Sequence, residues 1–399
     1  MPSCKQGEGG WKMEKNSQVY RFVLICLSIG VGLATPLLAL EVALRFMPVN
    51  EGLRTLPVNE QNPVRRFQPN RTSTWSRGWN FRQINSVHSN NYGFLNDIDY
   101  STTDPRPLVA IIGDSYIEAA MVPYKETSTG IVQRELSPAM RVYSFGASGS
   151  ALSDYLVYAR YARKLFQPNF LIVLVVGNDF DESFTEYNDE PGRTYFANTL
   201  PGEAYLERRN FEPSILRKIV QHSALAMYLS TNVQVGDLIQ PNWTFSEAGG
   251  NADAPRYLGN TAFAVDSSRL RDSRTAVDKF LSALPEASGL PTSKILIAVD
   301  GNRELIYGDI DEEIATVSFF GKMRTYVLAK SLEQGFRVLD LETVFSTAYA
   351  SSKNRFEWQY DWHWNSTGHA VFAEALVLQI QSEIHKNPPS NALHQRIAR

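Results

Sequence analysis

The sequence predicts an α/β protein: a three-layer α/β/α domain around a parallel sheet of about five strands, preceded by an N-terminal transmembrane helix. Two observations predict the domain. From Pro107 onward, short β-branched runs alternate with amphipathic stretches, and the runs are apolar at nearly every position, as in strands buried on both faces. A third observation, one long uncharged segment near the N-terminus, predicts the membrane helix.

The N-terminal segment from Phe22 to Leu40 contains about 19 residues without a charge, close to the roughly 20 that cross a bilayer as a helix. We therefore expect a single-pass anchor at residues 22–41. By the positive-inside rule, residues 1–21 stay cytoplasmic and the domain is extracytoplasmic, in the periplasm or at the cell surface, because basic residues precede the anchor: Lys5, Lys12, Lys15 and Arg21. Two alternatives stay open, a signal peptide cleaved near Gly32-Leu33-Ala34 and a buried helix of a soluble protein.

The domain is expected at residues 106–385, after a linker and N-terminal extension at 42–105 that is rich in Asn, Arg, Pro and Ser. Residues 386–399 form a C-terminal tail. Strands are predicted at 108–113, 141–145, 169–176, 294–299 and 336–341. Helices are predicted at about 126–137, 151–166, 267–284, 321–334 and 365–384.

One long segment, at about 181–266, does not follow the alternation of strands and helices and is interpreted as an insertion. It leaves the third strand at its carboxyl end, and loops at that edge of an open α/β sheet border the functional site. We expect it to line the pocket and select the acceptor. Its aromatic residues either stack on sugar rings or form a small core of their own; among them are Tyr187, Tyr195, Tyr205 and Trp243.

Composition excludes several classes of function. A net charge of −3 gives no reason to expect nucleic acid as a partner. The only cysteines are Cys4 and Cys26, so the domain has neither a disulfide scaffold nor a Cys-ligated zinc site. No Gly-rich phosphate or dinucleotide loop is present, and we expect neither a cofactor nor a metal.

The candidate catalytic residues are Ser115, in Gly113-Asp114-Ser115 at the end of the first strand, and the pair Asp361 and His363. A serine is a weak nucleophile at neutral pH unless an imidazole takes its proton and a carboxylate holds the ring. Two further strands end in Gly146 and Asn178, which can offer a backbone and a side-chain N–H to an oxyanion. All these strand ends meet at one edge of a parallel sheet.

Together these motifs resemble the SGNH hydrolases, or GDSL esterases and lipases, over roughly residues 105–385. The resemblance implies a flavodoxin-like fold, the triad Ser115, Asp361 and His363, and an oxyanion hole made by the N–H of Ser115, Gly146 and Asn178. Three blocks depart from the usual spelling: Ser144-Phe145-Gly146 stands for Asn-x-Gly, Gly177-Asn178 for Gly-x-Asn, and Asp361-x-His363 for Asp-x-x-His. The last, followed by Trp364, is similar to membrane-anchored polysaccharide O-acetyltransferases.

The resemblance implies a serine esterase that hydrolyses O-acyl esters, chiefly O-acetyl, on a carbohydrate or a small ester. Two alternatives stay open: an O-acyltransferase that passes the acyl group to a glycan, and a non-catalytic carbohydrate-binding protein of the envelope.

Purely structural roles also stay open for single residues. Ser115 can cap a helix, and Asp361 with His363 can be structural or bind a metal. Asp114 is expected to order its turn and His369 to pack or cap, whereas Trp362 and Trp364 are either core residues or a sugar-stacking surface.

Overall fold

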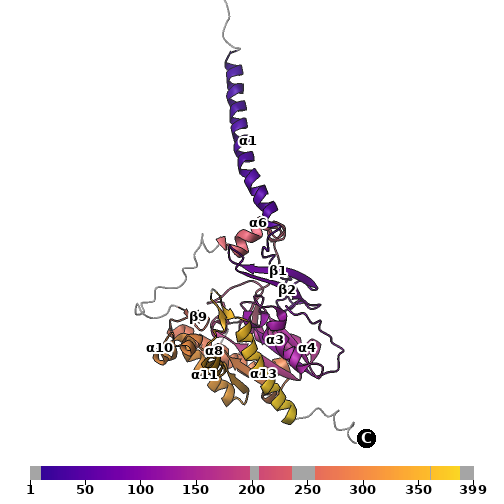
Figure 1. The fold of residues 1–399 in the computed structure, drawn as a ribbon, viewed down its shortest axis with the longest axis vertical. Helices are drawn as coiled ribbons and strands as arrows, with labels where there is room; N and C mark the ends of the chain where they lie inside the picture. Colours follow the sequence, from indigo (N-terminus) through magenta and orange to yellow (C-terminus); the bar gives the residue numbers. More distant parts are fainter. Residues whose placement is uncertain (1–9, 198–205, 236–256, 360, 387–399) are drawn as a thin grey trace, which may run out of the picture.

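The computed structural model describes residues 10–197, 206–235, 257–359 and 361–386. A long helix, α1 (Gly10–Leu44), projects away from an α/β domain (Figure 1). Its segment Val19–Leu44 is long and apolar enough to cross a membrane and is not buried against the rest of the protein. A signal sequence near the N-terminus has the same properties, so the orientation and the retention of this helix stay predictions.

The central sheet has five parallel strands in the order β11-β10-β5-β3-β4. Each strand lies within one residue of its predicted bounds, which confirms the predicted sheet. The strands are β3 (Leu108–Gly113), β4 (Arg141–Gly146), β5 (Phe170–Val175), β10 (Ile295–Val299) and β11 (Arg337–Asp340). The first strand of this sheet in chain order, β3, therefore lies in its interior, between β4 and β5.

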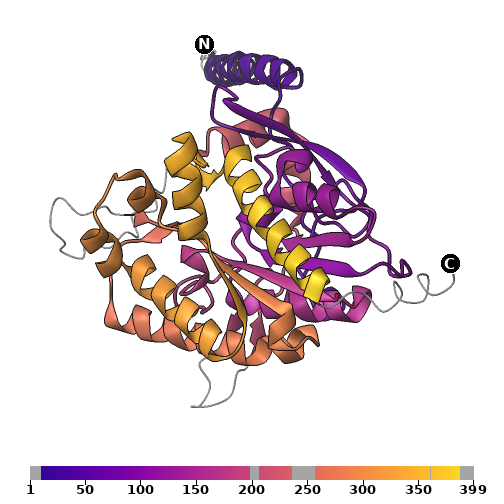
Figure 2. The ribbon, with the colours of Figure 1, turned by 60° about the horizontal axis from the view of Figure 1, so that its bottom comes forward.

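Helices cover both faces of this sheet, as the three-layer prediction requires. Alternate residues of β3 enter two separate cores, Ala110 on one face and Ile111 on the other. The first core contains α4 (Leu152–Phe166), α8 (Ser267–Ser288) and α11 (Phe319–Glu333). The second contains α3 (Ser128–Leu136), α12 (Leu341–Ser352) and α13 (Ser366–Lys386), the yellow helix that crosses its face in Figure 2.

Shorter elements complete the domain around the carboxyl ends of the strands. They are α2 (Ser115–Glu118), α9 (Arg303–Tyr307), α10 (Glu312–Val317), the strand pair β12 (Glu357–Trp358) and β13 (Asp361–Trp364), and the 3₁₀ turns η1 (Tyr124–Glu126) and η2 (Gly177–Asp179). A further 3₁₀ turn, η4 (Thr292–Lys294), directly precedes β10.

The N-terminal extension is a structured part of the domain. It contains an antiparallel hairpin of β1 (Arg71–Arg77) and β2 (Gln83–Ser89). Asn85 of β2 is buried and donates from Nδ2 to the carbonyl oxygens of Ala120 and Val122, both at 2.9 Å. Because these carbonyls belong to the loop after α2, the hairpin packs directly against the segment that follows the helix of Ser115.

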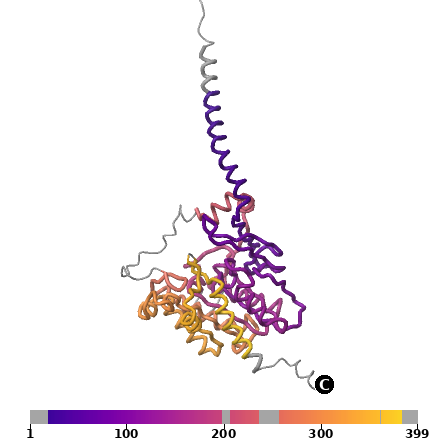
Figure 3. The backbone as a smooth tube through the Cα atoms, in the orientation of Figure 1, coloured from indigo at the N-terminus to yellow at the C-terminus, as the bar shows by residue number. Residues whose placement is uncertain are grey.

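The insertion contains more regular structure than its sequence indicates. Its described parts hold β6 (Thr194–Phe196) paired with β7 (Leu206–Arg208), α5 (Ile215–Val220), α6 (Ala224–Met227), the π-helical turn η3 (Tyr228–Asn232), and β8 (Tyr257–Leu258) paired with β9 (Thr261–Ala262). Figure 3 shows its described part 206–235 beside the domain-facing end of α1.

Of the aromatic residues singled out in the insertion, Tyr195 is buried and Tyr187 is half-buried with its hydroxyl donating to Asp272 of α8 at 2.8 Å. Tyr195 therefore packs within the protein, and Tyr187 packs partly buried against the core. Tyr205 and Trp243 lie outside the described residues.

Candidate active site

Ser115 lies where β3 turns into α2, and Asp114 shapes that turn. The carboxylate of Asp114 accepts the backbone N–H of Tyr116 at 3.0 Å, so Asp114 caps the helix, as expected. Its second oxygen accepts the hydroxyl of Ser115 at 3.1 Å. Burial raises the pKa of Asp114. The turn thus fixes the position of the serine hydroxyl at the start of a helix.

The structure brings the predicted triad together. The Oγ of Ser115 lies 2.7 Å from Nε2 of His363, and Nδ1 of His363 is hydrogen-bonded to Oδ1 of Asp361. Asp361 and His363 are alternate residues of the strand β13, so their side chains point to the same side. When Nδ1 donates to the carboxylate, Nε2 carries no proton and can accept the single hydroxyl proton of Ser115 in place of Asp114, which is the arrangement of a general base.

Arg77, at the end of β1, is a further member of the site that the sequence did not indicate. Its Nη1 lies 2.7 Å from Oδ2 of Asp361, the oxygen that His363 does not use. The Asp361 side chain is only 3% exposed, against 33% for Arg77. Burial favours the neutral acid, but the hydrogen bond and charge of His363 and the charge of Arg77 outweigh it and lower the pKa of Asp361 to about 2. Asp361 is therefore ionised throughout the neutral range.

A buried ion pair holds the backbone of β13 in place. Arg303 and Asp300, which follow β10, form an ion pair that is almost completely buried. The carbonyl of Trp362 accepts from the hydroxyl of Tyr116 at 2.8 Å and from Nη2 of Arg303 at 3.0 Å. Because Trp362 separates Asp361 from His363, these bonds fix the part of the strand that carries both side chains. The sequence feature that could have indicated this pair is Asp300 itself, an aspartate directly after the fourth predicted strand.

Gly146 lies at the end of β4, directly opposite Gly113 in the register of the sheet. A Cβ on Gly146 would come within 2.9 Å of the backbone nitrogen of Glu118 and 3.0 Å of the carbonyl oxygen of Asp114. Real Cβ atoms do not approach backbone so closely. Only glycine therefore lets β4 end against α2, beside Ser115.

Asn178 follows β5, the neighbour of β3 on the other side, so the nucleophile loop lies between the two predicted oxyanion donors. Its Nδ2 donates to Glu182 at 3.2 Å, and its Oδ1 accepts from Nδ2 of Asn260 at 2.6 Å. These two partners fix the orientation of the amide. Among the described residues, Glu182 is the acceptor for Nδ2, which carries two N–H groups. Burial raises the pKa of Glu182 to about 7.

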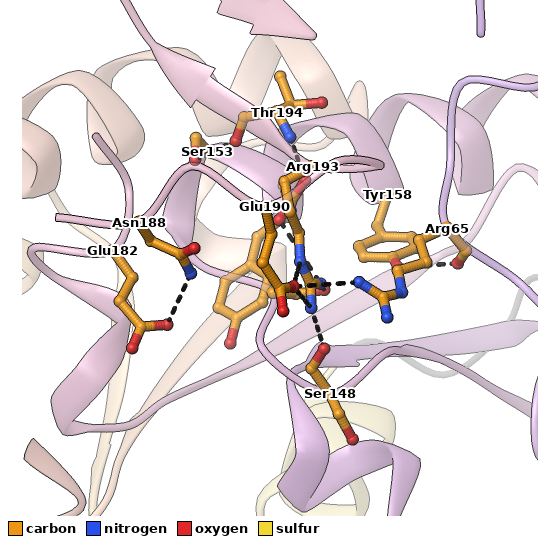
Figure 4. Close-up of polar contacts among 12 residues, drawn as sticks. Arg65, Ser148, Ser153, Tyr158, Glu182, Asn188, Glu190, Arg193 and Thr194 are labelled. Atoms are coloured by element: carbon orange, nitrogen blue, oxygen red, sulfur yellow. Dashed lines mark hydrogen bonds and ion pairs between the residues drawn. The ribbon is translucent and has the colours of Figure 1, made fainter. Parts of the chain in front are cut away.

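A polar cluster beside the site holds the loop after β4 (Figure 4). The buried guanidinium of Arg193 donates to the carbonyl of Ser148 and to Oγ of Ser150, and it pairs with Glu190 at 3.1 Å. On the other side of the loop, Ser148 donates its N–H to Glu118 of α2 at 2.6 Å. The insertion and α2 thus clamp the segment that begins at Gly146.

The neighbouring residues divide into core and surface. Trp364 is completely buried, whereas Trp362 is 51% exposed and contacts the ring of Tyr257, with centroids 5.9 Å apart. His369 is buried, accepts the N–H of Ser128 at 3.3 Å and packs on Trp364, as expected. Asp179 accepts the N–H of Val176 and the hydroxyl of Tyr155, which makes it a structural residue. Among the described residues, no group of three or more His, Cys, Asp or Glu side chains could hold a metal ion.

No protein-family model and no curated protein sequence matches this chain. Its fold is similar to several solved structures at low identity. A lipase/acylhydrolase from Enterococcus faecalis has 10% identity and a TM-score of 0.36, over 69% of this chain and 96% of that chain. An acetyl xylan esterase has 11% identity and a TM-score of 0.35, over 67% and 97%. A psychrotrophic esterase from Pseudoalteromonas sp. has 8% identity and a TM-score of 0.36, over 70% of this chain and 100% of that chain. Likeness at this level assigns no function to this chain.

Proposed function

We propose that this protein is a membrane-anchored, extracytoplasmic serine esterase that acts on O-acyl esters, with O-acetyl groups on a carbohydrate as its substrate class. The observation that carries the proposal is the continuous hydrogen-bond chain from Ser115 through His363 to Asp361. A serine, an imidazole and a buried ionised carboxylate in this order have the geometry of nucleophilic acyl transfer.

The mechanism follows from these atoms. As Oγ of Ser115 bonds to the ester carbon, Nε2 of His363 takes its proton and the carbonyl electrons move onto the oxygen. The N–H of Ser115, the end of β4 at Gly146 and the free N–H of Asn178 are the groups placed to stabilise that oxyanion. Collapse breaks the bond to the alcohol, which leaves with the proton from Nε2. The acyl-serine remains.

In the second half of the reaction, an acceptor hydroxyl gives its proton to Nε2 of His363 and attacks the acyl carbon, and Oγ of Ser115 takes the proton back. With water as the acceptor the protein is an esterase. With a sugar hydroxyl it is an O-acyltransferase, an alternative favoured by the Asp361-x-His363-Trp364 spelling. Both reactions use the same acyl-enzyme.

The proposed carbohydrate is supported by the aromatic surface beside the base. Trp362 is half exposed next to His363, and Tyr257 lies against it. Aromatic rings with an apolar face and a polar edge suit the stacking of a sugar ring. The uncharged segment of α1 and the basic residues that precede it support the anchored, extracytoplasmic topology.

The test is ester turnover by the full-length chain in detergent. Ser115→Ala should abolish turnover of a small acetyl ester, whereas Ser282→Ala, at an exposed serine of α8, should leave it unchanged. Adding a sugar acceptor distinguishes the two reactions, because an O-acyltransferase forms the acylated sugar at the expense of free acid. Wild-type turnover by Ser115→Ala would show that the proposed nucleophile is wrong.

A further inference from the structure

The helix α5 of the insertion exposes three large apolar side chains: Ile215 is 76% exposed, Leu216 is 70% and Ile219 is 64%. At positions i, i+1 and i+4 they lie on one side of the helix. Two basic residues, Arg217 and Lys218, occupy the turn between them. This combination of apolar and basic side chains is typical of helices that lie in a membrane interface.

The place of α5 in the fold points to a membrane more strongly than its composition does. A groove runs between α1 and the segment α5–α6. Leu37, Leu38, Glu41 and Arg45 form one wall, and Ile219, His222, Ser223 and Leu225 form the other. Figures 1 and 2 both show this segment against the domain-facing end of α1.

The contact between α1 and α6 is specific. The carboxylate of Glu41 accepts the hydroxyl of Ser223 at 2.8 Å and the N–H groups of Leu225 at 2.9 Å and Ala224 at 3.1 Å. These are the free donors at the start of α6, which Glu41 satisfies from the neighbouring helix. The anchor helix is thus tied to the insertion by several bonds and is not a loose tether.

This contact fixes the depth of α5 relative to a bilayer. The uncharged run from Phe22 to Leu40 is about 28 Å long as a helix, close to the roughly 30 Å of hydrocarbon. Glu41 is the first charge after it and marks the outer boundary. Leu37 and Leu38 lie within the last turn before that boundary, and Ile219 shares a groove with them. The apolar side of α5 is therefore at the outer edge of the hydrocarbon layer.

We propose that α5 lies in the plane of the outer leaflet and forms a second membrane contact beside α1. Its occupant is a phospholipid surface, with Ile215, Leu216 and Ile219 among the upper acyl chains and Arg217 and Lys218 at the phosphates. The proposal rests on the anchor assigned above. Two contacts restrict rotation of the domain about α1, so the insertion orients the active site relative to the membrane.

The experiment places a fluorescent label on α5 in the full-length chain. Native thiols are removed by Cys4→Ser and Cys26→Ser, and Ile219→Cys is labelled with a polarity-sensitive dye in phosphatidylcholine–phosphatidylglycerol vesicles. The matched control is Leu332→Cys on α11, since Leu332 is 63% exposed and Ile219 is 64%. We expect spin-labelled lipid to quench position 219 and not 332, and aqueous iodide to quench 332 and not 219.

Equal quenching of both positions by iodide would overturn the proposal. Protection of position 219 from iodide and from lipid alike would overturn it too, because protein and not lipid would then cover α5. Alkaline extraction of the same vesicles tests the anchor separately: release of the chain refutes the anchor and with it the contact of α5. A chain that resists extraction but exposes position 219 to water refutes α5 alone. Turnover of a soluble ester reports on Ser115 independently of both.

Discussion

Replacement of Arg77 by Gln tests whether the N-terminal hairpin is part of the active site. Arg77 donates to the Asp361 oxygen that His363 leaves free, at 2.7 Å. A hydrogen bond to a charged group contributes about 1.5–3 kcal/mol. Because Arg77 is 33% exposed, solvent screens part of this, and about 1–2 kcal/mol remains for holding the carboxylate in place. Since about 1.4 kcal/mol of transition-state stabilisation corresponds to a tenfold change in rate, kcat/KM for a small acetyl ester should fall roughly 5- to 30-fold.

A double-mutant cycle separates this effect from general damage. If Arg77 acts by positioning Asp361, then Arg77→Gln should cost little in an Asp361→Asn background, a change that should itself lower kcat by several orders of magnitude. Arg71→Gln is the matched control, because Arg71 lies on the same strand and pairs with the exposed Glu51. An unchanged kcat/KM in Arg77→Gln, or an equal loss in both backgrounds, would refute the reasoning.

Three further variants test other parts of the site. Arg303→Met should lower the free energy of unfolding by about 3–5 kcal/mol, since it leaves buried Asp300 unpaired, whereas Arg355→Met, in an exposed pair, should cost under about 1 kcal/mol; equal losses in urea unfolding would be contrary evidence. Glu182→Gln should become more stable than the parent as pH rises from about 5 to 8. The folded chain holds the proton of Glu182 up to about pH 7 rather than to the ordinary 4.5, so the parent loses up to about 3 kcal/mol across that range; a difference that does not change with pH would contradict this. Gly146→Ala should lower turnover at least about tenfold and cost about 1–3 kcal/mol, because its Cβ meets backbone; wild-type activity would show that α2 can move aside.

The central sheet could be predicted from the sequence because four of its five strands, β3, β4, β5 and β10, are buried at every position. The residues of Leu108–Gly113, for example, are apolar without interruption, so the ends of the apolar run mark the ends of the strand. The short strands of the insertion lack this signal. Thr194–Phe196 and Leu206–Arg208 pair with each other in a two-stranded sheet, and three residues are too few to show a period of two.

The site divides in the same way. Ser115, Asp361 and His363 could be predicted because they stand in local patterns, a strand-to-helix turn and an alternate pair. Arg77 could not, since 284 residues separate it from Asp361 and its neighbours are polar. The contact exists only because the N-terminal hairpin packs against the carboxyl edge of the sheet. Asn260, the partner of Asn178, could not be predicted either, because 82 residues separate the two.

The central claim is that Ser115 forms a covalent acyl intermediate. The direct measurement is mass spectrometry of the full-length chain, quenched with acid during turnover of an acetyl ester and digested into peptides. The proposal predicts the mass of one acetyl group on Ser115, with no such adduct in the His363→Ala variant, which lacks the base. Steady hydrolysis with Ser115 unmodified, or an acetyl group on another residue that disappears as turnover ends, would contradict it.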